Sequence, residues 1–330
     1  MSVARLVVGS RGSALALVQA EWVAARLRES NPALEVTIAT VATTGDRILD
    51  VPLAKIGDKG LFTKELETAL LDGRVDLAVH SAKDLPTALP AGCAIGAFTR
   101  REDARDVFVV AGDGRRPAGP ASLPAGARVG SSSLRRRSQL LALRPDLRLV
   151  DLRGNVETRL GKLADEGLDG TVLAAAGLSR LARAGLAAFT FDYEQMLPAV
   201  GQGALAVETR AGDERVAALV ARLNDRPTAL AVRAERALLG ALEGGCQIPI
   251  GAFAELRGAP RDGRDTSDGR AARGAQLVLR AFVGSLDGAA TVRDALTAPA
   301  DEPEALGEAL AERLRAAGAD RILAELRGAS

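Results

Sequence analysis

Apolar residues along the first eighty positions follow two spacings. Short apolar runs at 6–8 and 36–41, and alternating apolar residues at 75–79, are typical of strands. Between them, residues 14–27 and 61–71 carry apolar side chains three and four positions apart, which predicts helices. Strands that alternate with helices predict parallel α/β sheets. The stretch 43–60 lacks periodicity and is a candidate mobile loop.

The same order of elements returns further along the chain. Val129-Gly130-Ser131 ends a predicted strand and precedes a helix, as Val8-Gly9-Ser10 does. The last third mixes helices with strands and contains a polar insertion at 257–274. We therefore expect an α/β protein with two similar doubly wound domains and a small C-terminal α+β domain. The expected boundaries are 1–98 with 200–219 for domain 1, 99–199 for domain 2 and 220–330 for domain 3.

Three consecutive arginines lie at a predicted helix start. Ser132 or Ser133 is a good N-cap for the helix that begins at Leu134, so Arg135 to Arg137 fall in its first turn. The positive end of the helix dipole repels cations there, at a cost of about 0.3–1 kcal/mol each. A bound anion would offset this cost, because backbone N–H groups, hydroxyls and guanidiniums bind carboxylates and phosphates. A solvated basic helix end is the alternative.

Other arginines also follow predicted strands. Ligands of open parallel sheets bind beyond the carboxyl ends of the strands. Arginines at these positions should therefore converge on one cleft for a ligand with several negative charges, although any one of them could be a surface residue or a structural ion pair. No G-x-x-x-x-G-K-[ST] loop is present, and guanidinium forks suit carboxylates. These arginines are Arg11, Arg135, Arg136, Arg153, Arg159 and Arg180.

Two further side chains could carry chemistry. Asp84 follows a strand beside Lys83, where a carboxylate among cations stays ionised and can stabilise a positive charge or move a proton. Its position alone favours a turn cap. Cys246 lies in a Gly-Gly-Cys-Gln loop and could be a nucleophile or a covalent anchor. Most single cysteines are inert apolar residues, as we expect Cys93 to be.

Composition restricts the remaining classes of function. The 330 residues have a net charge of +1 and 3% aromatics, which argues against nucleic-acid binding. One histidine and two distant cysteines predict neither a metal site nor a disulfide framework, and they suit a reducing cytoplasm. No apolar run is long enough to span a membrane, and the first residues do not resemble a secretory signal.

Five motifs stand in order along the chain: VHSAKDLP at 79–86, GSSSLRR at 130–136, LRGNV at 152–156, PAVGQG at 198–203 and EGGCQIP at 243–249. Together they closely resemble the porphobilinogen deaminase family, also called hydroxymethylbilane synthases, over essentially the whole chain. The resemblance implies a transferase of tetrapyrrole and haem biosynthesis. It would join four porphobilinogen molecules head to tail, release four ammonia molecules and carry a covalent dipyrromethane cofactor.

The resemblance also implies residue roles. Cys246 matches the cysteine that holds the cofactor through a thioether, and Asp84 matches the catalytic aspartate, which stabilises the cation left when ammonia departs. Lys55 and Lys59 match the mobile loop over the cleft. Residues that match groups holding the cofactor carboxylates are Lys83, Ser133, Arg135 and Arg136. Residues that match groups binding the substrate or the growing chain are Arg11, Ser13, Arg153, Arg159 and Arg180.

The main alternative is an anion-binding protein without catalysis, because the first two expected domains resemble periplasmic-binding-protein type II architecture. The absence of a signal sequence, together with Asp84 and Cys246, favours the enzyme. The enzyme interpretation predicts a cytoplasmic monomer with porphobilinogen as its partner and without nucleic acid, membrane or metal.

Overall fold

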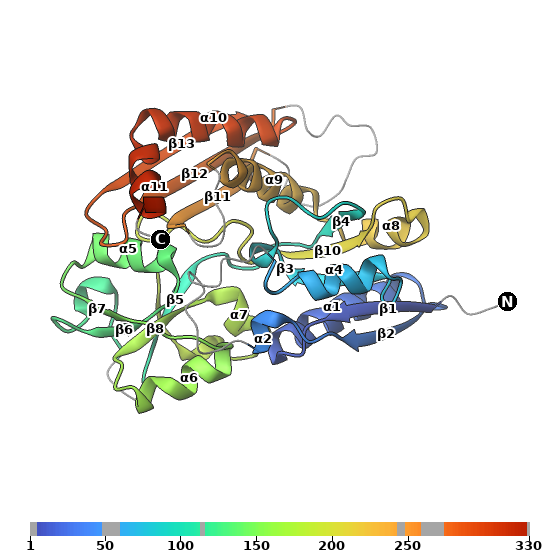
Figure 1. Cartoon of the computed structure of the whole chain (residues 1–330), viewed down its shortest axis with the longest axis horizontal. Helices are drawn as coiled ribbons and strands as arrows, with labels where there is room; N and C mark the ends of the chain where they lie inside the picture. Colours follow the sequence, from blue (N-terminus) through green and yellow to red (C-terminus); the bar gives the residue numbers. More distant parts are fainter. Residues whose placement is uncertain (1–4, 48–59, 113–115, 243–247, 259–273, 329–330) are drawn as a thin grey trace.

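The computed structural model describes residues 5–47, 60–112, 116–242, 248–258 and 274–328. Three sheets organise these residues, and Figure 1 shows the first at the right, the second at the lower left and the third above them. None of the described helices combines the length and apolar character needed to cross a bilayer.

The first sheet has the strand order β2-β1-β3-β10-β4. Its first three strands are parallel, and β10 is antiparallel to both of its neighbours. Helices α1 and α8 cover one face and α4 the other, so the sheet is wound on both sides. The elements are β1 (Arg5–Ser10), α1 (Ala14–Ser30), β2 (Glu35–Thr40), α2 (Thr44–Arg47), α4 (Lys64–Leu71), β3 (Leu77–Ser81), β4 (Cys93–Phe98), β10 (Leu205–Arg210) and α8 (Glu214–Val220).

The second sheet repeats this plan with the order β7-β6-β8-β5-β9. Three parallel strands are again followed by an antiparallel one, and α5 covers one face while α6 and α7 cover the other. The elements are β5 (Asp106–Val110), β6 (Arg128–Gly130), α5 (Leu134–Leu143), β7 (Arg148–Val150), α6 (Val156–Asp165), β8 (Gly170–Ala174), α7 (Ala175–Arg180) and β9 (Ala187–Thr190). The two similar doubly wound units expected from the sequence are confirmed.

The chain crosses between these sheets twice, after β4 and before β10. Gly203 lies in the second crossing with a φ of +93°, and a Cβ atom there would lie 2.5 Å from the carbonyl oxygen of Glu102 in the first crossing. Only glycine therefore lets the two segments approach so closely. The 199–203 stretch, which contains the PAVGQG motif's glycines, crosses between the sheets.

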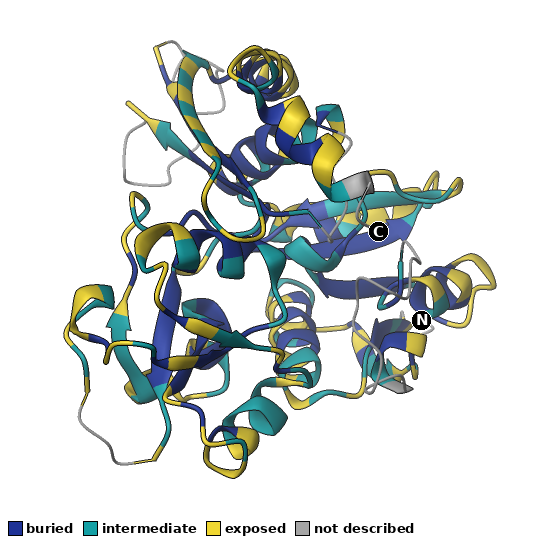
Figure 2. Cartoon of the chain, turned by 60° about the vertical axis from the view of Figure 1, so that its left-hand side comes forward, coloured by how far each residue is buried: buried dark blue, intermediate teal, exposed yellow. Residues whose placement is uncertain are grey.

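The third sheet is an antiparallel meander of β11 (Ile250–Arg257), β12 (Gln276–Gly284) and β13 (Thr291–Pro299). Helices α9 (Arg226–Ala241), α10 (Pro303–Ala316) and α11 (Ala319–Gly328) complete this α+β unit. Their apolar side chains share one core with the sheet, and Figure 2 shows helices that are buried on the inner side and exposed on the outer side. The small C-terminal α+β unit expected from the sequence is present.

A buried ion pair ties the crossing segments to this third unit. Both carboxylate oxygens of Glu235 in α9 accept hydrogen bonds from the Arg101 guanidinium, at 2.6 and 3.1 Å. The same carboxylate accepts the backbone N–H groups of Gly201 and Ala254. Arg101 also donates to the carbonyl oxygen of Gln202. One carboxylate thus links three parts of the chain, and all its bonds are charge-assisted.

Candidate active site

Several of the sequence-predicted residues that the structure describes follow the carboxyl ends of the parallel strands, where ligands of such sheets bind. Asp84 ends a short 3-10 helix (Ala82–Asp84) directly after β3. Its half-buried carboxylate forms no hydrogen bond or ion pair with any described residue. The turn-cap alternative is therefore not supported. A carboxylate without a partner at a strand end is available for a ligand.

Arg135 and Arg136 are buried in the first turn of α5, where the sequence placed them. Ser133 is the N-cap, and its hydroxyl accepts the N–H of Arg136 at 3.5 Å. Both guanidiniums bind Asp106, which is completely buried: Arg135 Nη1 at 2.7 Å from Oδ2, and Arg136 Nη2 at 2.8 Å from Oδ1. Arg135 also donates to the carbonyl oxygen of Leu197. The anion that the helix-dipole argument required is thus supplied, at least in part, by the protein itself.

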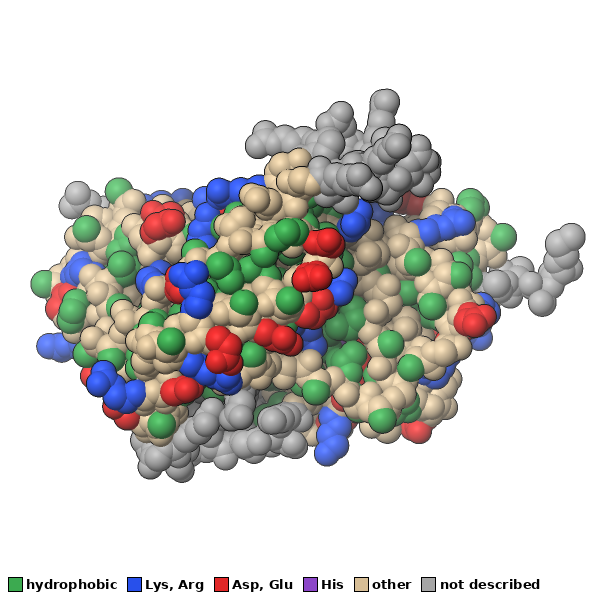
Figure 3. Space-filling model, turned by 90° about the horizontal axis from the view of Figure 1, so that it is seen from above, with side chains coloured by type: hydrophobic (Ala, Val, Ile, Leu, Met, Phe, Trp, Pro, Cys, Tyr) green, Lys and Arg blue, Asp and Glu red, His purple; other side chains and the backbone are tan. Residues whose placement is uncertain are grey.

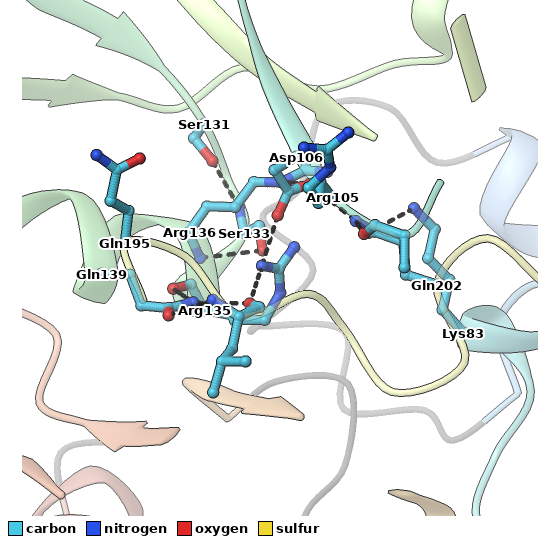
Figure 4. Close-up of polar contacts among 12 residues, drawn as sticks. Lys83, Arg105, Asp106, Ser131, Ser133, Arg135, Arg136, Gln139, Gln195 and Gln202 are labelled. Atoms are coloured by element: carbon cyan, nitrogen blue, oxygen red, sulfur yellow. Dashed lines mark hydrogen bonds and ion pairs between the residues drawn. The ribbon is translucent and has the colours of Figure 1, made fainter. Parts of the chain in front are cut away.

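Asp106 and Gln202 are the residues that sequence reasoning missed. Burial alone would raise the pKa of Asp106, but Arg135 and Arg136 hold it far below its ordinary range. Gln202 donates to Asp106 Oδ1 at 3.0 Å and accepts from Lys83 Nζ at 3.4 Å, so it connects Lys83 with Asp106 (Figure 4). The available signal was an acidic residue at the start of the apolar run 107–110.

Lys83 contributes a cation whose charge is sensitive to its surroundings. Burial lowers the pKa of Lys83 to about 8; the carboxylates of Asp84 and Asp106 oppose this shift, whereas Arg135 and Arg136 add to it. A ligand carboxylate close to Lys83 would raise this pKa again, because an opposite charge favours the protonated amine.

Arg153 and Arg159 add two further cations, which follow strand β7 of the second sheet. Burial lowers the pKa of Arg159 to about 10, and repulsion from Arg136 and Arg153 adds to this effect while Asp84 opposes it. Arg159 Nε donates to the carbonyl oxygen of Gly154. Arg153 Nη1 and the Ser132 hydroxyl are buried without any hydrogen-bond partner in the described structure. Buried donors without partners are costly unless a ligand satisfies them.

The other predicted binding residues have protein partners in the described structure. Arg11 is paired with Asp46 at 2.5 Å, and the Ser13 hydroxyl caps α1 by accepting the N–H of Ala16. Arg180 donates to the carbonyl oxygen of Gly203 at 2.6 Å and lies 3.5 Å from Glu102, beside a cavity of about 160 Å³. Lys55, Lys59 and Cys246 lie outside the described residues.

We call Lys83, Arg135, Arg136, Arg153 and Arg159 the cation cluster. It is accompanied by two carboxylates, Asp84 and Asp106, which leaves an excess of three positive charges. The buried donors without partners at Arg153 and Ser132 fit the carboxylates of a ligand with several negative charges, such as a chain of pyrroles that each carry two carboxylates. Fold and site together define a protein of two α/β units and one α+β unit, with a cluster of cations suited to a polycarboxylate ligand.

Comparisons with known proteins are more specific. The family description "Porphobilinogen deaminase, dipyromethane cofactor binding domain" matches residues 6–218, and "Porphobilinogen deaminase, C-terminal domain" matches residues 229–316. The chain belongs to the porphobilinogen deaminase family. It is therefore a transferase of tetrapyrrole biosynthesis that forms hydroxymethylbilane from porphobilinogen and uses a dipyrromethane cofactor.

Curated relatives agree over nearly the whole chain. The porphobilinogen deaminase of Moorella thermoacetica is 54% identical over 98% of this chain and 97% of its own length. That of Syntrophotalea carbinolica is 50% identical, over 99% and 97%. Among solved structures, a periplasmic VFT2 domain of Bordetella pertussis BvgS has a TM-score of 0.38 at 18% identity, covering 67% of this chain and 86% of that chain.

Proposed function

We propose that Asp84 is the catalytic residue of this hydroxymethylbilane synthase. Its carboxylate has no partner among the described residues, although its charge acts on both Lys83 and Arg159. An ionised carboxylate in a positively charged cleft can stabilise the cation that develops on the substrate when ammonia leaves. It can also accept the proton that the pyrrole carbon loses after coupling and, once protonated, donate that proton to the next departing amine. This carboxylate within the cation cluster is the observation on which the proposal rests.

We propose that the cofactor is tethered to Cys246, which lies outside the described residues, and is held by Lys83, Ser133, Arg135 and Arg136. When bound, the dipyrromethane supplies the pyrrole carbon to which substrate units are joined. Arg136 and Lys83 can donate to its carboxylates. Arg135 donates to Asp106 and to the carbonyl oxygen of Leu197 through Nη1, so its Nε and Nη2 donors remain for a ligand carboxylate.

The substrate and the growing chain would be bound by the remaining predicted residues. Arg153 and Arg159 lack a carboxylate partner at hydrogen-bond distance among the described residues, so their charges are available for acetate and propionate groups. The same role is proposed for Arg11, Ser13 and Arg180, with Lys55 and Lys59 on the loop over the cleft. Each pyrrole unit carries two carboxylates, so a growing chain needs several such partners.

We also propose that the protein is a cytoplasmic monomer without a nucleic-acid partner, and that its domains are 1–98 with 200–219, 99–199 and 220–330. Basic and acidic side chains are interspersed on the face shown in Figure 3, which supports the absence of a nucleic-acid partner. The strand β10 in the first sheet supports the assignment of 200–219 to domain 1.

Two measurements test the proposed roles. Intact-mass spectrometry should find a dipyrromethane adduct on the purified protein, and Cys246→Ala should remove it. Asp84→Asn should keep the adduct and the unfolding temperature but lower porphobilinogen turnover by at least about 100-fold. The control is Asp72→Asn, since the Asp72 carboxylate is exposed and pairs with Arg74 at 3.5 Å. Normal turnover by Asp84→Asn would remove Asp84 from the mechanism, and an adduct on Cys246→Ala would relocate the tether.

A further inference from the structure

Arg11 is held along one edge of its guanidinium. Nη2 lies 2.5 Å from Asp46 Oδ1 and Nε lies 3.3 Å from Oδ2, while Nη1 forms no hydrogen bond with a described residue. The ring of Phe62 packs against the flat side of the guanidinium, with Cζ 4.3 Å from the ring centroid. Arg11 is thus fixed in orientation and keeps donors free for a second anion.

Asp46 is itself held in place by neighbouring residues, so it can fix the orientation of Arg11. Its Oδ2 accepts the Thr43 hydroxyl at 2.7 Å and the Thr43 N–H at 3.4 Å. The Gly45 N–H donates to the carbonyl oxygen of Leu61 at 2.8 Å. A Cβ atom on Gly45 would lie only 2.2 Å from the ring of Phe62, so the ring packs directly on this backbone. The carboxylate and the aromatic ring therefore form one rigid support for Arg11.

The ionisation of Asp46 fits this arrangement. Burial alone would raise the pKa of Asp46, but the hydrogen bonds from Arg11 and Thr43 lower it below its ordinary value. Both side chains of the pair are about one-quarter exposed, at 22% for Arg11 and 28% for Asp46, so a ligand can reach them from solvent.

We propose that Asp46 is a positioning residue for the substrate: by holding the Nε–Nη2 edge of Arg11, it presents the remaining donors of the guanidinium to a carboxylate of porphobilinogen. This inference rests on the proposed substrate role of Arg11. A flexible arginine would lose side-chain freedom on binding, whereas an arginine already fixed by a carboxylate and a ring loses little. The alternative is that Asp46 competes with the substrate for Arg11. Removing the Asp46 charge would then lower KM for porphobilinogen, whereas loss of a positioning residue raises it.

The test is Asp46→Asn, which keeps the shape and removes the charge. We expect KM for porphobilinogen to rise about fivefold, with kcat within about twofold, because a partly exposed ion pair of this kind is lost. Thr43→Val removes one hydrogen bond to Asp46 without touching a charge and should raise KM about twofold. The matched control is Asp76→Asn, since Asp76 is 20% exposed and pairs with Arg210 and Arg215. It should leave KM unchanged.

A second measurement separates positioning from a general effect on the fold. The dissociation constant of porphobilinogen is measured with Asp84→Asn as the background, in which chemistry is blocked. Asp46→Asn should weaken binding there about fivefold, and should have no further effect once Arg11→Ala is also present, because the two residues act as one unit. An effect of Asp46→Asn that persists without Arg11 would overturn the proposal, as would an unchanged or lowered KM.

Failure of the proposed function looks different. If Arg11→Ala leaves both KM and the dissociation constant unchanged, then Arg11 does not bind substrate, and the role of Asp46 falls with it. If Arg11→Ala weakens binding but Asp46→Asn and Thr43→Val do not, the substrate role of Arg11 stands and only the positioning role of Asp46 is refuted.

Discussion

Replacing Asp106 by asparagine should show how strongly the cation cluster depends on one carboxylate. Asp106 is completely buried and accepts three hydrogen bonds from two guanidiniums: one from Arg135 Nη1 at 2.7 Å, and two from Arg136 Nε and Nη2 at 3.2 and 2.8 Å. Removing one member of a buried charged group typically costs about 3–5 kcal/mol, because its partners stay buried without compensation. We expect the free energy of unfolding of cofactor-free Asp106→Asn to fall by this amount.

The assay is urea-induced unfolding in two backgrounds. Cofactor-free protein is obtained with Cys246→Ala, and cofactor-bearing protein with the native cysteine. If dipyrromethane carboxylates bind Arg136 and Lys83, they supply part of the missing negative charge, so the loss should be smaller in the cofactor-bearing protein. The control is Asp103→Asn, which breaks an ion pair with Arg105 in which both side chains are about 40% exposed and should cost less than about 1 kcal/mol.

The pKa of Asp106 also predicts how the free energy of unfolding changes with pH. The folded protein holds the pKa of Asp106 below its ordinary value of 3.8, so the stabilisation is fully present above that value and is lost as pH falls below it. Unfolding free energy of the wild type should therefore decline more steeply below about pH 4 than that of Asp106→Asn. A loss below about 1 kcal/mol at neutral pH in the cofactor-free protein would refute the reasoning, since a buried charged group cannot be removed so cheaply.

Two further predictions concern Lys83 and Glu235. Burial lowers the pKa of Lys83 from 10.5 to about 8, so between these pH values the unfolded chain binds more protons than the folded protein. The free energy of unfolding of the wild type should therefore rise from about pH 8 to 10 relative to that of Lys83→Met. Equal pH profiles of the two proteins in urea unfolding would contradict this prediction. Glu235→Gln breaks the buried pair with Arg101 and should cost roughly 3 kcal/mol in unfolding free energy. Glu304→Gln breaks the exposed pair with Arg233 and should cost less than about 1 kcal/mol, and similar losses would show that burial is not decisive.

Local pattern predicted the elements whose signals are local. Helix α6, Val156–Asp165, follows Asn155, which caps it by accepting the N–H of Thr158. The helix expected after Ser133 begins at Leu134, as the cap and the spacing indicate. The 61–71 helix begins later than expected, at Lys64, because residues 60–63 form a turn in which Thr63 donates to the carbonyl oxygen of Gly60. Ends of helices are decided by such turns more than by apolar spacing.

Strands that depend on distant partners were not identified from the sequence. β10 (Leu205–Arg210) lies in the first sheet because it pairs antiparallel with β3, more than 120 residues earlier. Within the described residues, β4 and β9 pair only with β10 and β5, the antiparallel strands of their sheets. β13 has the polar Asp294 among its half-buried positions. No local periodicity encodes such pairing, since strand propensity depends on neighbours in the sheet.

The sequence indicated the cationic residues of the candidate site but not the carboxylates that pair with them. Lys83, Arg136 and Arg159 follow parallel strands and interact electrostatically, because sheet topology brings the carboxyl ends of those strands together. Their roles in binding stay predictions. Asp106 and Asp46 could not be recognised, since an acidic residue in a sequence does not show which arginine it will meet.

Some arginines of the candidate site already pair with a carboxylate and others do not. This difference indicates where a ligand carboxylate gains most binding free energy. Arg11, Arg135 and Arg136 already have a carboxylate at hydrogen-bond distance, so a ligand carboxylate there adds to an existing ion pair. Arg153 and Arg159 have none at that distance among the described residues, and one donor of Arg153 is buried without any partner. Burial has removed water from the donors of these two arginines without giving them a carboxylate partner. A ligand carboxylate there forms charge-assisted hydrogen bonds that offset this desolvation cost. The charge of Asp84 acts on Arg159, so this gain in binding falls next to the proposed catalytic carboxylate.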